Sequence, residues 1–289
     1  DYDGATGEYM SVRYALAHSV NIPAVRVLNE MGIATGTSYL DKMRLSVPDD
    51  DKSLALALGG MKEGFTLPAL ADGYATFASG GMYAPSGYIS RIEDERGNVL
   101  YSHAAGQERV FSEDVSWLVS DMLQTTVQEG TAKKLRALSF PVCAKTGTAG
   151  TPAGNTDAYC IAYTKDHVVA VWMGNADNSP VEATGGGLPA NAVLAVMRAL
   201  YQGGAPTPFK ECSDVVRLNF DRTAYENEHT ILLADPVGPP ATSLSELFRA
   251  NAAPGEVCTR FSMPSIRTPD IRVSGGTVTI ALSRTRYYD

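Results

Sequence analysis

The 289-residue sequence has few of the residues that build metal, redox and nucleic-acid sites. Its four cysteines, Cys143, Cys160, Cys212 and Cys258, lie too far apart for a C-x-x-C metal or redox motif. The four histidines are equally scattered, so the sequence predicts no metal site. Lysine and arginine number 24 against 32 aspartates and glutamates, and the resulting net charge of −8 argues against nucleic acid as a partner.

Long hydrophobic runs are also missing. No apolar run reaches the ~18–20 residues that span a bilayer. The sequence begins at Asp1 with neither a starter methionine nor a basic-then-apolar leader, so we expect a piece of a longer protein. With 44% hydrophobic and 19% charged residues the chain can bury a core, and its length favours one large unit plus a small one.

The hydrophobic pattern predicts a mixed α/β fold of the α+β type. Helices are expected at 12–18 and from Pro23 to Met31, with Asn21 as the cap of the second. Further helices should begin at Thr66, Ser112 and Pro189, and a hairpin should join residues 88–92 to 98–101. Three strand-like runs with short links, 142–148, 158–163 and 168–173, predict antiparallel neighbours.

A stretch rich in proline and glycine at 203–208 predicts a domain boundary. The expected domains are residues 1–205 and a small β-rich unit, residues 206–289. In the second unit the pattern predicts strands at 215–220, 230–233 and 277–282, a turn at Gly275-Gly276, and a short helix at 243–250.

The strongest chemical signal is Lys145-Thr146-Gly147-Thr148 on the first of the three strands. Glycine between two hydroxyl residues lets a ligand approach the backbone, while the lysine supplies charge and the threonines supply hydrogen bonds. This pattern suits a receptor for a carboxylate. An edge strand with a solvated lysine and a glycine bulge explains the same tetrapeptide equally well.

A second signal is Ser19-Val20-Asn21, which lies in the break between the first two expected helices. The serine can pass a proton and the asparagine can hold an amide. Taken alone, such a tripeptide is far more often a simple helix cap.

The two motifs in this order, joined by helices and followed by an antiparallel hairpin, resemble those of the transpeptidase domain of class A (bifunctional) penicillin-binding proteins. The resemblance covers roughly residues 5–205 and implies that family's antiparallel sheet flanked by helices. Further stretches that resemble the family are residues 15–26, 57–60, 73–81, 88–100 and 157–174.

The resemblance also implies roles for individual residues. Ser19 and Lys145 would be catalytic, with Ser19 relaying a proton to the leaving nitrogen. Asn21 would hold an amide of the donor peptide, and Thr146 and Thr148 would receive, with Lys145, the carboxylate of a D-Ala-D-Ala stem or a β-lactam antibiotic. Gly147 would keep the strand free of bulk, and the Thr148 backbone N–H would be one oxyanion donor. No cofactor is implied.

One part of the family pattern is missing. The sequence contains no S-x-x-K, and its only T-x-x-K, Thr131 to Lys134, lies in a polar turn after Gly130. The resemblance therefore places the nucleophilic serine and its lysine base in a companion segment upstream of Asp1. It implies an extracytoplasmic protein, in the periplasm or at the cell surface, anchored in the membrane through a segment outside this chain.

Three expectations about structure follow. The five polar residues of the two motifs should converge on one groove. Because the missing helix and strands belong to the core, either a companion chain should fill their place or an open, under-packed face should lie beside Lys145. An extracytoplasmic location permits a disulfide between Cys212 and Cys258 in the small unit.

Two other functions stay open from the sequence. One is a non-catalytic module that binds cell-wall peptide or a partner protein, which the missing serine favours. The other is a β-lactamase or β-lactam sensor of the same fold.

Overall fold

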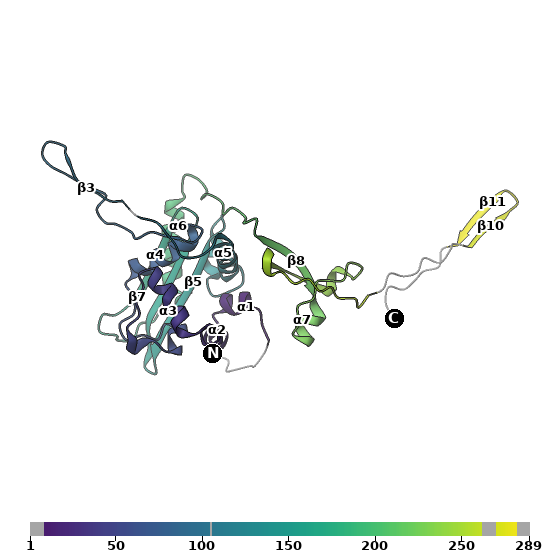
Figure 1. Cartoon of the computed structure of the whole chain (residues 1–289), viewed down its shortest axis with the longest axis horizontal. Coiled ribbons are helices and arrows are strands. Elements are labelled where there is room, and N and C mark those ends of the chain that lie inside the picture. Colours follow the sequence, from purple (N-terminus) through teal and green to yellow (C-terminus); the bar gives the residue numbers. More distant parts are fainter. Residues whose placement is uncertain (1–8, 105, 262–269, 282–289) are drawn as a thin grey trace. The chain divides into compact units, whose positions relative to one another are not determined.

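A computed structural model describes residues 9–104, 106–261 and 270–281 (Figure 1). The chain forms two compact units, Asp1–Ser213 and Asp214–Asp289. The predicted division into domains of residues 1–205 and 206–289 stays a prediction. Within the described ranges, every helix is too short or too polar to cross a membrane.

The first unit combines helices with small antiparallel sheets. Its helices are α1 (Val12–His18), α2 (Asn21–Met31), α3 (Ile33–Lys42), α4 (Leu67–Ala78), α5 (Glu113–Gln128) and α6 (Leu188–Leu200). Its strands are β1 (Met82–Tyr83), β2 (Arg91–Glu93), β3 (Val99–Ser102), β4 (Glu108–Arg109), β5 (Cys143–Thr151), β6 (Gly154–Tyr163) and β7 (Val168–Gly174). The mixed fold predicted from the sequence is confirmed.

The central sheet has the order β5-β6-β7 with both pairs antiparallel, as predicted. In its register Lys145 lies opposite Ile161 and Thr146 opposite Cys160. Because successive side chains point to opposite faces, Lys145 and Gly147 share one face, and Thr146 shares the other with Ala144.

Helices cover both faces of this sheet. On one face Val142, Ala144 and Cys160 pack into a buried cluster with Val193 and Met197 of α6. On the other, Cys143 and Tyr163 pack with Ala78 of α4 and Leu123 of α5. Strand β5, which carries the Lys145-Thr146-Gly147-Thr148 motif, is therefore packed on both faces. The Lys145 side chain lies on the face covered by α4 and α5.

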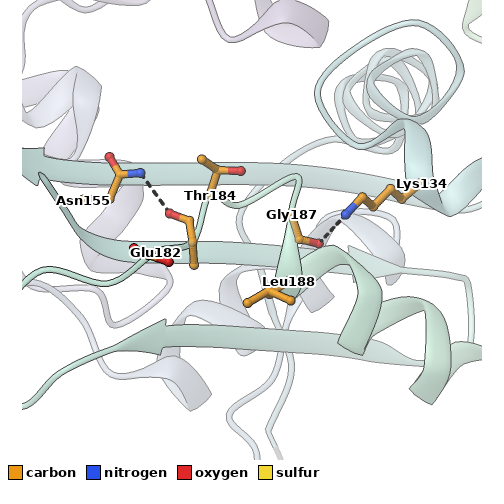
Figure 2. Close-up of a pocket in the computed structure, with 7 residues that line it drawn as sticks. Lys134, Asn155, Glu182, Thr184, Gly187 and Leu188 are labelled. Atoms are coloured by element: carbon orange, nitrogen blue, oxygen red, sulfur yellow. Dashed lines mark hydrogen bonds between the residues drawn. The ribbon is translucent and has the colours of Figure 1, made fainter.

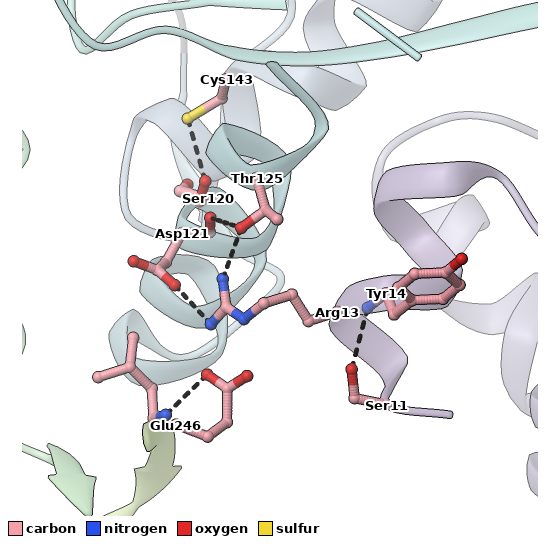
Figure 3. Close-up of polar contacts among 9 residues, drawn as sticks. Ser11, Arg13, Tyr14, Ser120, Asp121, Thr125, Cys143 and Glu246 are labelled. Carbon is pink, nitrogen blue, oxygen red and sulfur yellow. Dashed lines mark hydrogen bonds and ion pairs between the residues drawn. The ribbon is translucent and has the colours of Figure 1, made fainter. Parts of the chain in front are cut away.

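Helix α1 is fastened to α5 by a polar clamp (Figure 3). The guanidinium of Arg13 forms an ion pair with Asp121 at 2.6 Å and donates to the Thr125 hydroxyl at 2.9 Å. Both charged side chains of the pair are about one-fifth exposed, which reduces screening by solvent. The clamp fixes the helix that ends at Ser19 relative to the helix that packs on β5.

The expected helices of the first unit are present, and α3 is an additional one. Asn21 is the first residue of α2, and Val20 occupies the cap position, so the predicted capping role of Asn21 is wrong. The apolar side chains of α1 and α2 differ in burial. Leu28 is buried, but Val12 is 62% exposed and Met31 41% exposed.

The second unit is built on the antiparallel pair β8 (Val215–Asp221) and β9 (Ser243–Arg249), with α7 (Arg222–Glu228) between them in sequence. A helix at 243–250 was therefore the wrong prediction. Pairing with β8 satisfies the backbone of this segment, and Leu244 and Phe248 lie opposite Phe220 and Val216.

The other predicted strands of this unit have mixed outcomes. Around 230–233 only Leu233 makes bridges, to Phe220 and Val257, in place of a full strand. The turn at Gly275-Gly276 is confirmed, because both glycines have positive φ and join β10 (Asp270–Ser274) to β11 (Thr277–Ala281).

The predicted Cys212–Cys258 disulfide is wrong. All four cysteines lie in described segments and are free thiols. Cys212 belongs to the first unit and Cys258 to the second, where its backbone N–H donates to Leu233.

Candidate active site

Ser19 ends α1 in a conformation that non-glycine residues seldom adopt. Its φ of 58° and ψ of 43° are left-handed, and its backbone N–H donates to the last turn of the helix. This conformation turns the chain sharply before α2 begins at Asn21. A strained residue of this kind is more common at functional sites than elsewhere.

The lysine of β5 reaches Ser19 across the sequence. The Lys145 ammonium donates to the Ser19 hydroxyl at 2.7 Å and to the backbone oxygen of Thr146 at 2.8 Å. The two residues are 126 positions apart. Because an ammonium can only donate, the Ser19 oxygen accepts and its own proton stays available for another group.

All six residues of the two motifs that were singled out line one cavity of about 630 Å³. They are Ser19, Asn21, Lys145, Thr146, Gly147 and Thr148. The predicted convergence is thus present in the structure.

The rest of this cavity is apolar and open. Its walls include Val12, Val27 and Leu58, which are 62%, 50% and 51% exposed, and the half-buried Tyr74 of α4. Exposed apolar side chains gathered around one hollow are unusual for a surface that faces only water. An open apolar wall therefore lies in the cavity that Lys145 lines.

Burial changes the titration of Lys145. Desolvation lowers its pKa from the usual 10.5 to about 8, because the charged ammonium loses contact with water. The charge on Lys145 is therefore present below pH 8 and lost as the pH rises through that value.

This shift can be measured directly. In residues 1–289 labelled with ¹³C at the lysine ε-carbon, we expect one lysine to titrate near pH 8, and its signal should be missing from Lys145→Met. A titration of Lys145 together with the exposed lysines near pH 10.5 would contradict the desolvated site.

A loop between β7 and α6 supports β5 on the face opposite Lys145. The Gly185 backbone N–H donates to the Thr148 hydroxyl at 3.0 Å. A Cβ added at Gly185 would lie 2.6 Å from the Gly147 carbonyl oxygen, so the loop lies flat against the motif strand. Glycine is required here by close approach of two backbones.

Two side-chain bonds hold this loop around a second hollow of about 320 Å³ (Figure 2). Lys134 donates to the backbone oxygen of Gly187 at 3.0 Å, and the Asn155 amide donates to that of Ala183 at 2.9 Å. The lysine of the T-x-x-K segment, Lys134, therefore supports the loop between β7 and α6.

Sequence reasoning missed Thr131 at this site. Its hydroxyl lies 2.6 Å from that of Thr146, although the segment had been interpreted only as a polar turn. The available signal was Gly130 immediately before it, which marks a close approach of the backbone to its neighbours. A Cβ at Gly130 would overlap the carbonyl of Ala17 in α1.

Comparison with known proteins agrees with this geometry. Residues 1–198 match the model for the penicillin-binding protein transpeptidase domain. The chain belongs to this family. The identification made from the sequence motifs is confirmed.

Proteins similar to this chain in sequence include bacterial penicillin-binding proteins. Penicillin-binding protein 1F of Bacillus subtilis is 38% identical over 177 residues, covering 60% of this chain and 24% of that protein. Penicillin-binding protein 2a of Streptococcus pneumoniae is 32% identical over 172 residues, 58% of this chain and 23% of that protein. The chain thus spans about a quarter of the length of these relatives.

Solved structures share the fold. Penicillin-binding protein 1A of Haemophilus influenzae superposes with a TM-score of 0.70 at 22% identity, over 86% of this chain and 41% of that one. PonA1 of Mycobacterium tuberculosis, solved in complex with penicillin V, superposes with a TM-score of 0.64 at 20% identity. The match covers 74% of this chain and 62% of that one.

Proposed function

We propose that this chain is the C-terminal part of a peptidoglycan D,D-transpeptidase that transfers an acyl group through a covalent serine ester. The observation that supports this most is the 2.7 Å contact between Lys145 and Ser19, which joins the two motifs in one cavity. Cavity residues of these types suit a peptide that ends in a carboxylate.

Each motif residue has a role in this proposal. Ser19, which accepts from Lys145, donates its own proton to the leaving nitrogen of the terminal D-alanine and takes in its place the proton that the lysine base has removed from the nucleophilic serine. Asn21 binds an amide of the donor peptide. The Thr148 backbone N–H stabilises the oxyanion of the tetrahedral intermediate together with the N–H of the nucleophilic serine.

The carboxylate of the stem peptide binds at Lys145, Thr146 and Thr148. Gly147 leaves room for the ligand to run along the strand. A Cβ there would meet only Tyr159, at an ordinary 3.6 Å, so packing within the protein does not demand glycine at this position.

The nucleophile and its lysine base come from a companion segment with S-x-x-K, upstream of these residues. That serine attacks the penultimate D-alanine carbonyl, and the bond to the terminal D-alanine breaks. An amine of a second stem peptide then attacks the ester, forms the cross-link and releases the serine. The segment packs on the open apolar wall formed by Val12, Val27 and Leu58.

The same proposal covers ligands and location. A β-lactam occupies the donor site and acylates the serine, as the PonA1 complex with penicillin V leads us to expect for this family member. The enzyme works outside the cytoplasm, where its peptidoglycan substrate is, and is anchored through a segment beyond this chain.

The lifetime of a fluorescent penicillin adduct tests the function. On the longer protein that includes the S-x-x-K segment we expect stable labelling that survives gel electrophoresis. Rapid turnover of the adduct would instead identify a β-lactamase. Complete absence of labelling, with the protein folded, would identify a non-catalytic binding module and refute the proposal.

A further inference from the structure

Thr131 connects the two motifs although it belongs to neither. Its backbone N–H donates to the Ala17 carbonyl at 3.1 Å, two residues before Ser19, and its hydroxyl lies 2.6 Å from that of Thr146. One residue therefore contacts both the end of α1 and the motif strand.

The backbone around Thr131 is closely confined. On one side Gly130 packs so tightly on α1 that a Cβ would overlap the Ala17 carbonyl. On the other, a Cβ at Gly186 would lie 2.5 Å from the Thr131 carbonyl oxygen. With its backbone fixed by α1 and by the loop between β7 and α6 that contains Gly186, Thr131 presents its hydroxyl to Thr146 in a defined position.

The neighbouring Thr148 shows what such a contact does. An amide N–H can only donate, so the bond from Gly185 makes the Thr148 oxygen an acceptor. The Thr148 proton is then free to point into the cavity, which this residue lines. A carboxylate, which only accepts hydrogen bonds, needs protons aimed at it in this way.

Among the described residues, no amide N–H donates to the hydroxyl of Thr146, which pairs with that of Thr131. The geometry of the pair with Thr131 allows either oxygen to donate. We propose that Thr131 is a positioning residue, which donates its hydroxyl proton to Thr146 when a carboxylate is bound and so turns the Thr146 proton toward the ligand. Both threonines of the motif then present protons to the anion.

This inference rests on the proposed function and adds a source of selectivity to it. The Thr131 hydroxyl should matter for ligands with a free carboxylate and should not matter where that group is masked. A residue that served only to stabilise the fold would affect both ligands alike.

The test uses benzylpenicillin and its methyl ester on the longer protein that includes the S-x-x-K segment. Thr131→Val should lower the second-order rate constant of acylation by benzylpenicillin about five- to tenfold, as expected for losing one hydrogen bond in a site for an anion. The rate with the methyl ester should stay within about twofold, and Thr131→Ser should restore the rate with benzylpenicillin.

Thr35→Val in α3 is the matched control, because Thr35 is an exposed threonine of the same unit away from the cavity. It should leave both rates unchanged, and thermal unfolding of each variant reports its folding. Equal losses with both penicillins, or no loss in Thr131→Val, would overturn the inference and leave the proposed function intact. Failure of the unsubstituted protein to react would overturn the proposed function and the inference together.

Discussion

Replacing Lys145 with alanine is expected to cost about 2–4 kcal/mol in acylation by penicillin, roughly a 30- to 1000-fold loss in rate constant. The ammonium contacts the Ser19 hydroxyl and lies in the cavity that we propose for the carboxylate. Its removal takes away both the charge that attracts the ligand and the donor that orients Ser19. The rate constant is measured with a fluorescent penicillin on the longer protein.

Lys62→Ala is the control for this loss. Lys62 forms an ion pair with Asp50 in which both side chains are more than two-thirds exposed, and pairs of this kind contribute little. We expect its acylation rate to match that of the unsubstituted protein. An unchanged rate in Lys145→Ala would remove Lys145 from the carboxylate site.

Replacing Gly130 with alanine should destabilise the first unit by about 1–3 kcal/mol, the usual cost of forcing a methyl group into packed structure. The added Cβ would overlap the Ala17 carbonyl, a rigid backbone group that cannot turn away as a side chain can. Relief requires α1 to move from α5, against the clamp made by Arg13 and Asp121.

Denaturant unfolding of residues 1–289 measures this cost, with Gly203→Ala as the control. A Cβ at Gly203 meets nothing within 4 Å, so that variant should unfold like the original. Gly130→Ala should also change the environment of Ser19, which can be followed through the pKa of Lys145. Equal stability of the two variants would contradict the close approach of α1 to Gly130.

The sheet and the convergence of the motifs could be predicted because they rest on local patterns. Runs of apolar residues with short links marked β5, β6 and β7 and fixed their antiparallel pairing. A strand motif with Lys145 and a helix break with Ser19 were each weak alone, and their combination identified the family.

Features set by distant contacts could not be read from the sequence. Residues 243–249 form a strand because β8 lies beside them, whatever their local preference. The left-handed conformation of Ser19 and the contact of Thr131 with Thr146 depend on contacts between segments far apart in the sequence. The predicted disulfide is also absent, because Cys212 and Cys258 are both free thiols.

We propose that these 289 residues supply the carboxylate site and the proton relay, while the acylated serine lies in the S-x-x-K segment. Mass spectrometry after incubation with a labelled penicillin tests this most directly, on residues 1–289 alone and on the longer protein. We predict no adduct on residues 1–289 alone and a single adduct on the S-x-x-K serine of the longer protein. A covalent adduct on a serine within residues 1–289 would contradict the account.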